Sequence, residues 1–193
     1  MVPEISVCNR KPGIVVVEKF LNNPLEHREF ALGLEYEKEG SYGVRSKQAY
    51  AYPEYREAFQ SILQRQIVTW EGGVNGCYQW CDRHQDIVYH ADAQQYAGII
   101  FLTPGAPLNS GTSFWRSRNS GERVARGNSQ PHTFGPRGEH LKDGSQWELV
   151  DRVGNVFNRL VLFYGKYIHS ASHYFGDDIH DSRLFQVFFF NCK

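Results

Sequence analysis

Residues 86–102 read DIVYHADAQQYAGIIFL, and this stretch carries a polar pair directly before an apolar segment. The pair is His90 and Asp92, which flank the small residue Ala91. Side chains of an extended chain alternate between two faces, so both polar groups are expected on one face. The segment 97–102 is wholly apolar, which predicts a buried strand. A histidine and a carboxylate that enter a buried sheet need partners, because an unpaired buried charge is costly.

A divalent metal ion is a partner that would satisfy both groups, and it needs a third ligand. His169 is the candidate, because it ends the predicted strand 167–169 and precedes the small residues 170–172. Two histidines and one carboxylate form the facial triad that holds non-haem Fe(II) with open positions. His173 and His180 are rivals, and a zinc site on His169 and His173 is an alternative. The His-x-Asp pair alone is a weak pattern, which solvated strand ends also show.

Arg183 begins the apolar run 183–190, which reads RLFQVFFF. With a period of two, Phe185, Val187 and Phe189 share its face. A guanidinium group is suited to bidentate binding of a carboxylate, and a cation on an apolar inward face needs an anionic partner. The pattern therefore indicates a carboxylate-binding arginine, while an arginine that only caps a barrel rim is the alternative.

The composition is typical of a single globular domain over residues 1–193, with 41% hydrophobic and 15% aromatic residues. Lys+Arg and Asp+Glu both total 21, which argues against nucleic-acid binding. The four cysteines match neither a four-cysteine zinc site nor a disulfide framework. We see no signal peptide and no run long enough to span a membrane, so we expect a cytoplasmic protein with no membrane partner.

The N-terminal part, residues 1–72, is expected to hold one strand and two supporting helices. The β-branched run at 14–17 predicts the strand. Proline at the first helical position predicts one helix over about 24–34 and a second from residue 53, with apolar side chains at helical spacing as far as residue 70. The Gly- and Tyr-containing stretch 35–50 is expected to be irregular.

Residues 73–193 change to short strands separated by turn residues, which predicts a mainly β core. Two helices packed on one sheet of such a core fit a jelly-roll or cupin-like barrel, which can hold a metal inside one end. The segment 116–146, rich in Gly, Ser, Arg and Asn, is expected to be a long loop, either a lid over the site or disordered. Apolar residues over 147–157 predict a short helix. Strands are expected at 77–81, 86–90, 96–102, 111–115, 160–164, 167–169 and 183–190.

The ordered set of these motifs resembles the Fe(II)/2-oxoglutarate-dependent dioxygenases, in particular the prolyl-4-hydroxylase-like branch. The likeness spans roughly residues 77–190, and the N-terminal motifs Asn23-Pro24 and Gly43-Val44-Arg45-Ser46 are similar to small uncharacterised relatives of that branch. The combination is specific, although each motif alone is not. The motifs are His90-Ala91-Asp92, then 96–102, Gly111-Thr112-Ser113-Phe114-Trp115, 157–170 and 183–190.

This resemblance implies a double-stranded β-helix and an enzyme whose chemistry resides in the metal centre. His90, Asp92 and His169 correspond to the iron ligands, and Arg183 to the residue that binds the distal carboxylate of 2-oxoglutarate. Dioxygen is then the second co-substrate, and ascorbate supports activity in vitro. The implied reaction hydroxylates a C–H bond of an amino acid, a peptide or a small metabolite and releases succinate and carbon dioxide.

One position departs from the family pattern, because Phe185 stands where the family often has a hydroxyl residue. A second contact to the distal carboxylate must then come from elsewhere, with Tyr78, Tyr89 and Asn158 as candidates and Tyr78 preferred. Two other classes stay open: a jelly-roll metal-binding module without oxygenase turnover, and a zinc hydrolase or cupin-type enzyme that does not use 2-oxoglutarate. The sequence does not indicate the substrate or the oligomeric state.

Overall fold

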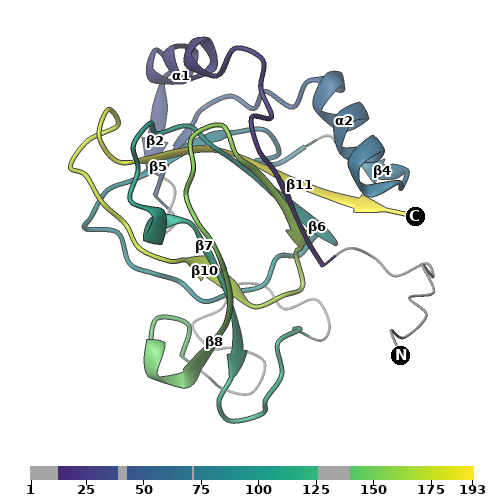
Figure 1. Ribbon diagram of the computed structural model, residues 1–193, viewed down its shortest axis with the longest axis vertical. Helices are drawn as coiled ribbons and strands as arrows, with labels where there is room; N and C mark the ends of the chain where they lie inside the picture. The colour runs from purple at the N-terminus through teal and green to yellow at the C-terminus, as the bar shows by residue number, and fades with distance from the viewer. Residues whose placement is uncertain (1–12, 39–42, 71, 126–139) are drawn as a thin grey trace, which may run out of the picture.

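The computed structural model describes residues 13–38, 43–70, 72–125 and 140–193, which form two antiparallel sheets and two helices (Figure 1). The large sheet has eight strands in the order β1-β9-β6-β11-β5-β3-β2, with β4 paired to the far end of β11. The small sheet has the order β10-β7-β8. The large sheet comprises β1 (Ile14–Val17), β2 (Tyr36–Lys38), β3 (Val44–Ser46), β4 (Ile67–Thr69), β5 (Tyr78–Cys81), β6 (Tyr96–Phe101), β9 (Leu160–Tyr164) and β11 (Arg183–Cys192), and the small sheet comprises β7 (Thr112–Ser117), β8 (Trp147–Val153) and β10 (His169–Ala171).

Both helices cover one face of the large sheet, as Figure 1 shows. Helices α1 (Pro24–Leu32) and α2 (Pro53–Leu63) each begin with proline in the first turn, where the missing N–H is not needed. Phe59 of α2 is fully buried and packs edge-on against Phe188 of β11. The predicted arrangement of two N-terminal helices on one sheet is confirmed. No described helix is long and apolar enough to cross a membrane.

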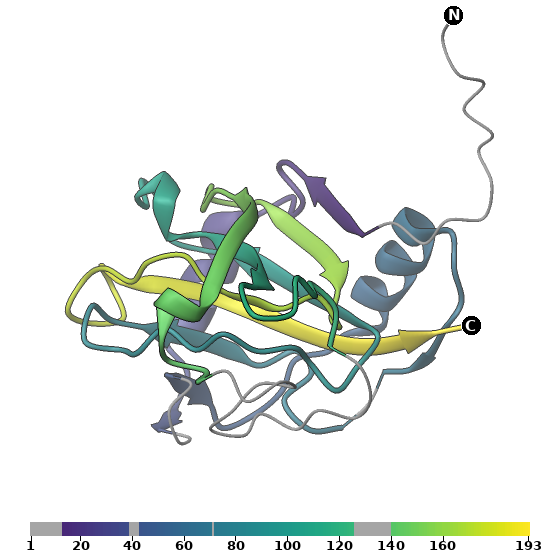
Figure 2. The ribbon, with the colours of Figure 1, turned by 90° about the horizontal axis from the view of Figure 1, so that it is seen from below.

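The central strand β11 separates two cores, because both of its faces are buried. Leu184, Phe188 and Phe190 belong to the core under the helices. Phe185 and Val187 belong to a second core, which Phe114 of the small sheet closes from the other side. Figure 1 shows β11 between the helices and the small sheet, and Figure 2 shows it running across the molecule. The predicted inward face of this strand is confirmed, and it faces the space between the two sheets.

Two predicted helical segments are wrong. Helix α2 ends at Leu63, because Gln64 adopts a left-handed conformation with φ of 52°, and the chain continues as β4 rather than helically to residue 70. The predicted helix over 147–157 is instead β8, which pairs with β7. In both segments the spacing of apolar residues allows a helix, but pairing with a neighbouring strand decides the structure.

Three further predictions, two for irregular segments and one for a strand, also need correction. The stretch 35–50 contains β2 and β3, which pair with each other. The predicted strand 86–90 makes only a single bridge, from His90 to His169. The predicted loop 116–146 is shorter, since Arg116 and Ser117 belong to β7 and η2 (Gly144–Gln146) forms a short 3₁₀ helix. Residues 126–139 of that loop lie outside the described residues.

Candidate metal centre and adjoining cavity

The structure brings His90, Asp92 and His169 together at one end of the space between the sheets. The backbone sets this arrangement, because His90 and His169 exchange two hydrogen bonds of 2.9 and 2.7 Å. The Asp92 N–H donates to the carbonyl of Gly165 at 2.7 Å. The segment 90–92 therefore runs antiparallel to 165–169, and its alternation points both polar side chains toward His169.

The three side chains present their ligand atoms to one point. His90 Nε2 lies 3.7 Å from Asp92 Oδ1, and His169 Nε2 lies 3.5 Å from Asp92 Oδ2. Ligand atoms that share a metal ion with bonds of about 2 Å lie about 3 to 4 Å apart. The spacing is too long for good hydrogen bonds but suits an ion between the three groups.

Hydrogen bonds to the backbone orient both imidazoles for metal binding. His90 Nδ1 lies 2.9 Å from the carbonyl of Val88, and His169 Nδ1 lies 2.8 Å from that of Tyr167. A carbonyl oxygen only accepts, so each Nδ1 carries the proton and each Nε2 offers a lone pair. This arrangement is common for metal-binding histidines, in which a hydrogen bond at the other nitrogen fixes the tautomer.

Burial and charge also fit a divalent cation. Burial lowers the pKa of His169 to about 4, so its imidazole is neutral at pH 7, which is the form that binds a metal. Asp92 Oδ2 is buried and has no hydrogen-bond partner among the described residues. An unpartnered buried carboxylate oxygen beside two imidazole lone pairs is the polar environment that a metal ion would satisfy.

Gly165 has no side chain, and this makes room for the neighbouring Asp92 side chain. A Cβ atom at Gly165 would lie 2.7 Å from the carbonyl oxygen of Gln94 and 3.2 Å from the Asp92 Cβ. We expect Gly165→Ala to displace the carboxylate and to weaken metal binding about tenfold, as loss of a supporting contact does elsewhere. Titration of the apoprotein with Ni(II) by calorimetry measures the effect. Gly33→Ala is the matched control, because a Cβ there meets nothing closer than 3.7 Å, and an unchanged affinity in Gly165→Ala would contradict the prediction.

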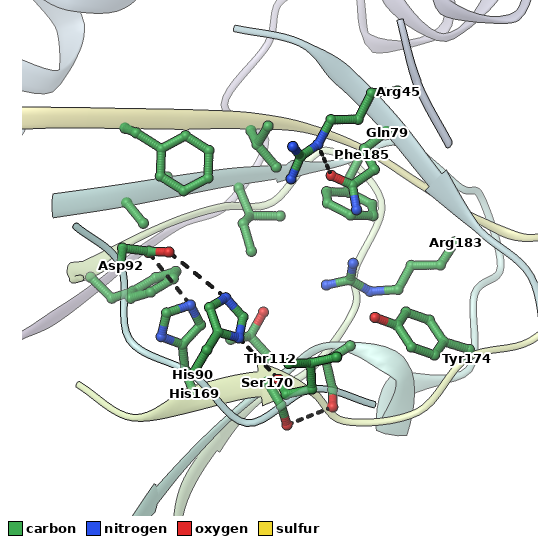
Figure 3. A pocket seen from close by; sticks show the side chains of 18 residues that line it. Arg45, Gln79, His90, Asp92, Thr112, His169, Ser170, Tyr174, Arg183 and Phe185 are labelled. Atoms are coloured by element: carbon green, nitrogen blue, oxygen red, sulfur yellow. Dashed lines mark hydrogen bonds and ion pairs between the residues drawn. The ribbon is translucent and has the colours of Figure 1, made fainter. Parts of the chain in front are cut away.

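Arg183 lies across the same cavity from the metal-ligand cluster (Figure 3). Its Nε donates to the carbonyl of Ser110 at 2.9 Å, and its guanidinium carbon lies 4.1 Å from the ring centroid of Phe185 and 5.2 Å from that of Phe101. The side chain is buried, which lowers its pKa, and no described carboxylate forms a salt bridge with it. A buried cation without an anionic partner indicates that an anion binds in the cavity.

The structure does not bring Tyr78 and Asn158 to this cavity. Tyr78 points to the opposite face of β5, where it packs beside Tyr50 in the core under the helices. Asn158 instead binds the backbone of Leu21 through both amide atoms, at 2.7 and 2.8 Å. Tyr89, the third candidate, stacks on Trp147 outside the cavity. Neither Tyr78 nor Asn158 is therefore positioned for the predicted contact with a co-substrate.

Two hydroxyl residues that the sequence analysis missed line the cavity beside Arg183. Thr112 follows Gly111, whose carbonyl lies 3.4 Å from Arg183 Nη2, and its buried Oγ1 has no hydrogen-bond partner among the described residues. Tyr174 extends from the loop after β10 with its hydroxyl directed into the cavity (Figure 3). The motif 111–115 contained a usable signal for Thr112, whereas nothing in the sequence around Tyr174 indicated its position. The rival histidines His173 and His180 are both exposed and lie outside the metal-ligand cluster.

Comparison with solved structures places the fold. HygX from Streptomyces hygroscopicus, solved with nickel, 2-oxoglutarate and hygromycin B, aligns over 92% of this chain and 82% of its own with a TM-score of 0.58 and 10% identity. A prolyl hydroxylase from Trichoplax adhaerens, bound to a hypoxia-inducible-factor peptide fragment, aligns over 92% and 83% with a TM-score of 0.52 and 10% identity. The non-haem α-ketoglutarate-dependent epimerase SnoN of nogalamycin biosynthesis aligns over 92% of this chain and 77% of its own, with a TM-score of 0.54 and 14% identity. No protein-family model and no curated protein matches the sequence.

The chain therefore has the double-stranded β-helix fold of the Fe/2-oxoglutarate oxygenases, and it carries a His-x-Asp…His cluster inside that fold. Prolyl hydroxylases are among the structures that share the fold, so the predicted likeness to them is confirmed at the level of the fold. The presence of an epimerase among the neighbours shows that the fold alone does not decide the reaction.

Proposed function

We propose that this protein is an Fe(II)- and 2-oxoglutarate-dependent dioxygenase that hydroxylates a C–H bond of a small molecule or peptide. The observation that carries the proposal is the placement of the metal-ligand cluster and the buried Arg183 on opposite sides of one cavity. In the balanced reaction, R–H, 2-oxoglutarate and dioxygen give R–OH, succinate and carbon dioxide. One oxygen atom enters the product and the other enters succinate.

Each described group has a role in this reaction. His90, Asp92 and His169 would hold Fe(II), which supplies the oxidative chemistry when bound. Arg183 binds the distal carboxylate of 2-oxoglutarate, because its guanidinium is fixed by backbone carbonyls and has no described anionic partner. The cavity walls between the two groups are apolar, with Ile99, Phe163 and Val187 among them, and they exclude water from the reacting atoms. The proteins of similar fold include one bound to a peptide and one bound to a small molecule, so either substrate type fits the proposal.

The direct test measures succinate formed from 2-oxoglutarate in the presence of Fe(II) and ascorbate. We expect slow turnover by the wild-type protein without added substrate and none by His90→Ala or His169→Ala. Metal content and circular dichroism of each variant separate loss of the metal from loss of the fold. Fe(II)-dependent binding of 2-oxoglutarate that survives removal of both histidines would contradict the proposal.

Thr112 is expected to provide the second contact to the distal carboxylate, because Phe185 has no hydroxyl with which to make it. Thr112→Val keeps the shape and removes the hydroxyl, so we expect the KM for 2-oxoglutarate to rise about 10-fold or more, as a lost hydrogen bond to a charged group implies. Metal affinity should not change. Ser113→Ala is the control, because the neighbouring Ser113 hydroxyl bonds Ser172 at 2.7 Å instead. Equal KM values for Thr112→Val and the wild type would exclude this role.

A further inference from the structure

A groove lies between α1 and α2, on the face of the large sheet that the helices cover. Its volume is about 750 Å³, which falls in the range of roughly 300 to 1,000 Å³ that is usual for ligand sites. Tyr78 of β5 lines this groove, whereas the next residue, Gln79, lines the cavity that holds the metal-ligand cluster. The described linings of the two have no residue in common, so the groove is a separate site behind the large sheet.

Helix α1 exposes an aromatic side chain and buries a charged one. Arg28 is buried, and its guanidinium donates to two backbone carbonyls at 2.9 and 2.6 Å. Phe30 is 43% exposed and lines the groove, together with Asn23, Glu26 and His27, which precede it at helical spacing. Amphipathic helices usually show the reverse pattern, so the groove face of α1 is expected to bind a partner.

Aromatic rings line the groove from both helices. Tyr52, at the start of α2, is 45% exposed and stacks on Tyr55 with ring centroids 6.3 Å apart. Phe20 also stacks on Tyr55, at 6.3 Å. Phe30 of α1 meets Tyr78 edge-on at 6.0 Å. These rings offer apolar area to a ligand, and the face of an exposed ring also attracts a cation.

The charge of the groove is negative. Glu26 and Glu54 are among its described lining residues, which include no lysine or arginine, and burial lowers the pKa of His27, so that its imidazole is neutral at pH 7. Glu26 accepts a hydrogen bond from the neutral Asn23 amide at 3.1 Å, and neither carboxylate forms a salt bridge with a described residue. Each helix N-terminus carries about half a positive charge, so the two carboxylates exceed the two helix ends by about one negative charge.

We propose that the groove between α1 and α2 is a binding site for a small organic cation, namely an amine with an apolar body. The ammonium group is recognised by the carboxylates of Glu26 and Glu54, and the body packs on the exposed rings of Phe30 and Tyr52. A neutral molecule of the same shape binds more weakly, because it gains neither the ion pair nor the cation–π contact. The site goes beyond the proposed dioxygenase function, and the result of either test leaves the other standing.

The test compares the Kd values of amines with those of their neutral and anionic counterparts, measured by calorimetry or ligand-observed NMR. The probes are phenethylamine and tryptamine, the matching alcohols phenethyl alcohol and tryptophol, and the acid hydrocinnamate. We expect at least one amine to bind about tenfold more tightly than its alcohol, and the acid to bind no better than the alcohol.

Three variants locate the binding. The double variant Glu26→Gln and Glu54→Gln should lose the preference for amines. The matched control is Glu29→Gln with Glu57→Gln, which removes two exposed carboxylates from the same helices outside the groove and should retain the preference. Tyr52→Leu keeps an apolar side chain without the ring, so amine binding should weaken about threefold or more. The Tm and circular dichroism of each variant check its fold.

Several outcomes would overturn the inference: no binding by either amine, equal binding of amine and alcohol, or a preference that persists without Glu26 and Glu54. Loss of amine binding in Asp92→Asn would assign the amine to the metal-ligand cluster and also overturn it. Binding of N-acetyl-phenylalanyl-lysine amide when neither amine binds would assign the groove to a protein partner instead. Self-association in sedimentation velocity that Tyr52→Leu removes would assign the groove to a second copy of the chain, with the same consequence.

Discussion

Replacing Asp92 by asparagine is expected to eliminate metal binding and all 2-oxoglutarate turnover. The amide keeps the size of the side chain but removes the negative charge, and one of its two ligand atoms becomes an N–H donor that cannot bind a cation. A metal at 100 times its Kd stabilises a native protein by about 2.7 kcal/mol, which raises the Tm of a domain of this size by about 5 to 10 °C. Thermal unfolding with and without Ni(II) should show this shift in the wild type and none in the variant.

The metal-free Asp92→Asn protein should be at least as stable as the metal-free wild type. Asp92 Oδ2 is buried without a described hydrogen-bond partner, and an unpaired buried charge costs free energy of folding. Loss of metal binding therefore cannot be attributed to unfolding. Asp151→Asn is the matched control, because this exposed carboxylate only pairs with Arg123 at 3.2 Å. A nickel-induced Tm shift that survives in Asp92→Asn would refute the assignment of the ligand.

The parts of the site that follow from local alternation could be predicted from the sequence. Arg183, Phe185 and Val187 line one cavity because a strand places every second residue on one face. The same rule placed His90 and Asp92 together, although their segment makes one bridge rather than a full strand. The pair needed only an extended backbone beside His169, so the error in the strand did not affect the site.

Alternation could not decide which face of β5 points to the cavity. Both Tyr78 and Gln79 are buried, so the strand lacks the contrast between polar and apolar residues that reveals its inner face. Tyr78 is the preferred candidate because it lies on the strand before the ligand pair, but the register places Gln79 in the cavity and Tyr78 under the helices. A shift of one residue exchanges the two faces, and pairing with β11 and β3 fixes the register.

Contacts between distant segments account for the residues that the sequence could not indicate. Arg45 reaches the cavity because β3 pairs with β5. Its partner on β5 is Gln79, which lies 34 residues further along the chain. Tyr174 enters from a loop whose sequence shows no periodic pattern. Such positions depend on the packing of whole sheets, whereas hydrophobic periodicity reports only on neighbours within one element.

Substitution of Arg183 is expected to remove binding of 2-oxoglutarate while metal binding persists. Arg183→Met keeps an apolar stem of similar length and leaves the carboxylate of a bound co-substrate without a cation, which should cost about 3 to 5 kcal/mol, or a Kd increase of 10² to 10³ or more. Calorimetric titration of the Ni(II)-loaded protein with 2-oxoglutarate measures the loss. The separate nickel titration should match the wild type, because the metal ligands lie across the cavity.

Two further variants distinguish the charge of Arg183 from its geometry. Arg183→Lys retains a cation but loses the hydrogen bond to Ser110 and the planar fork, so its affinity should fall between those of the wild type and Arg183→Met. Phe185→Leu removes the ring that stacks 4.1 Å from the guanidinium carbon and should cost about 0.5 to 2 kcal/mol. The expected order of affinity, from tightest to weakest, is wild type, Phe185→Leu, Arg183→Lys, Arg183→Met.

The stability of Arg183→Met should equal or exceed that of the wild type, because the buried cation has no described anionic partner in the absence of co-substrate. Undiminished binding of 2-oxoglutarate by Arg183→Met would show that Arg183 does not bind the distal carboxylate, although Arg45 also lines this cavity.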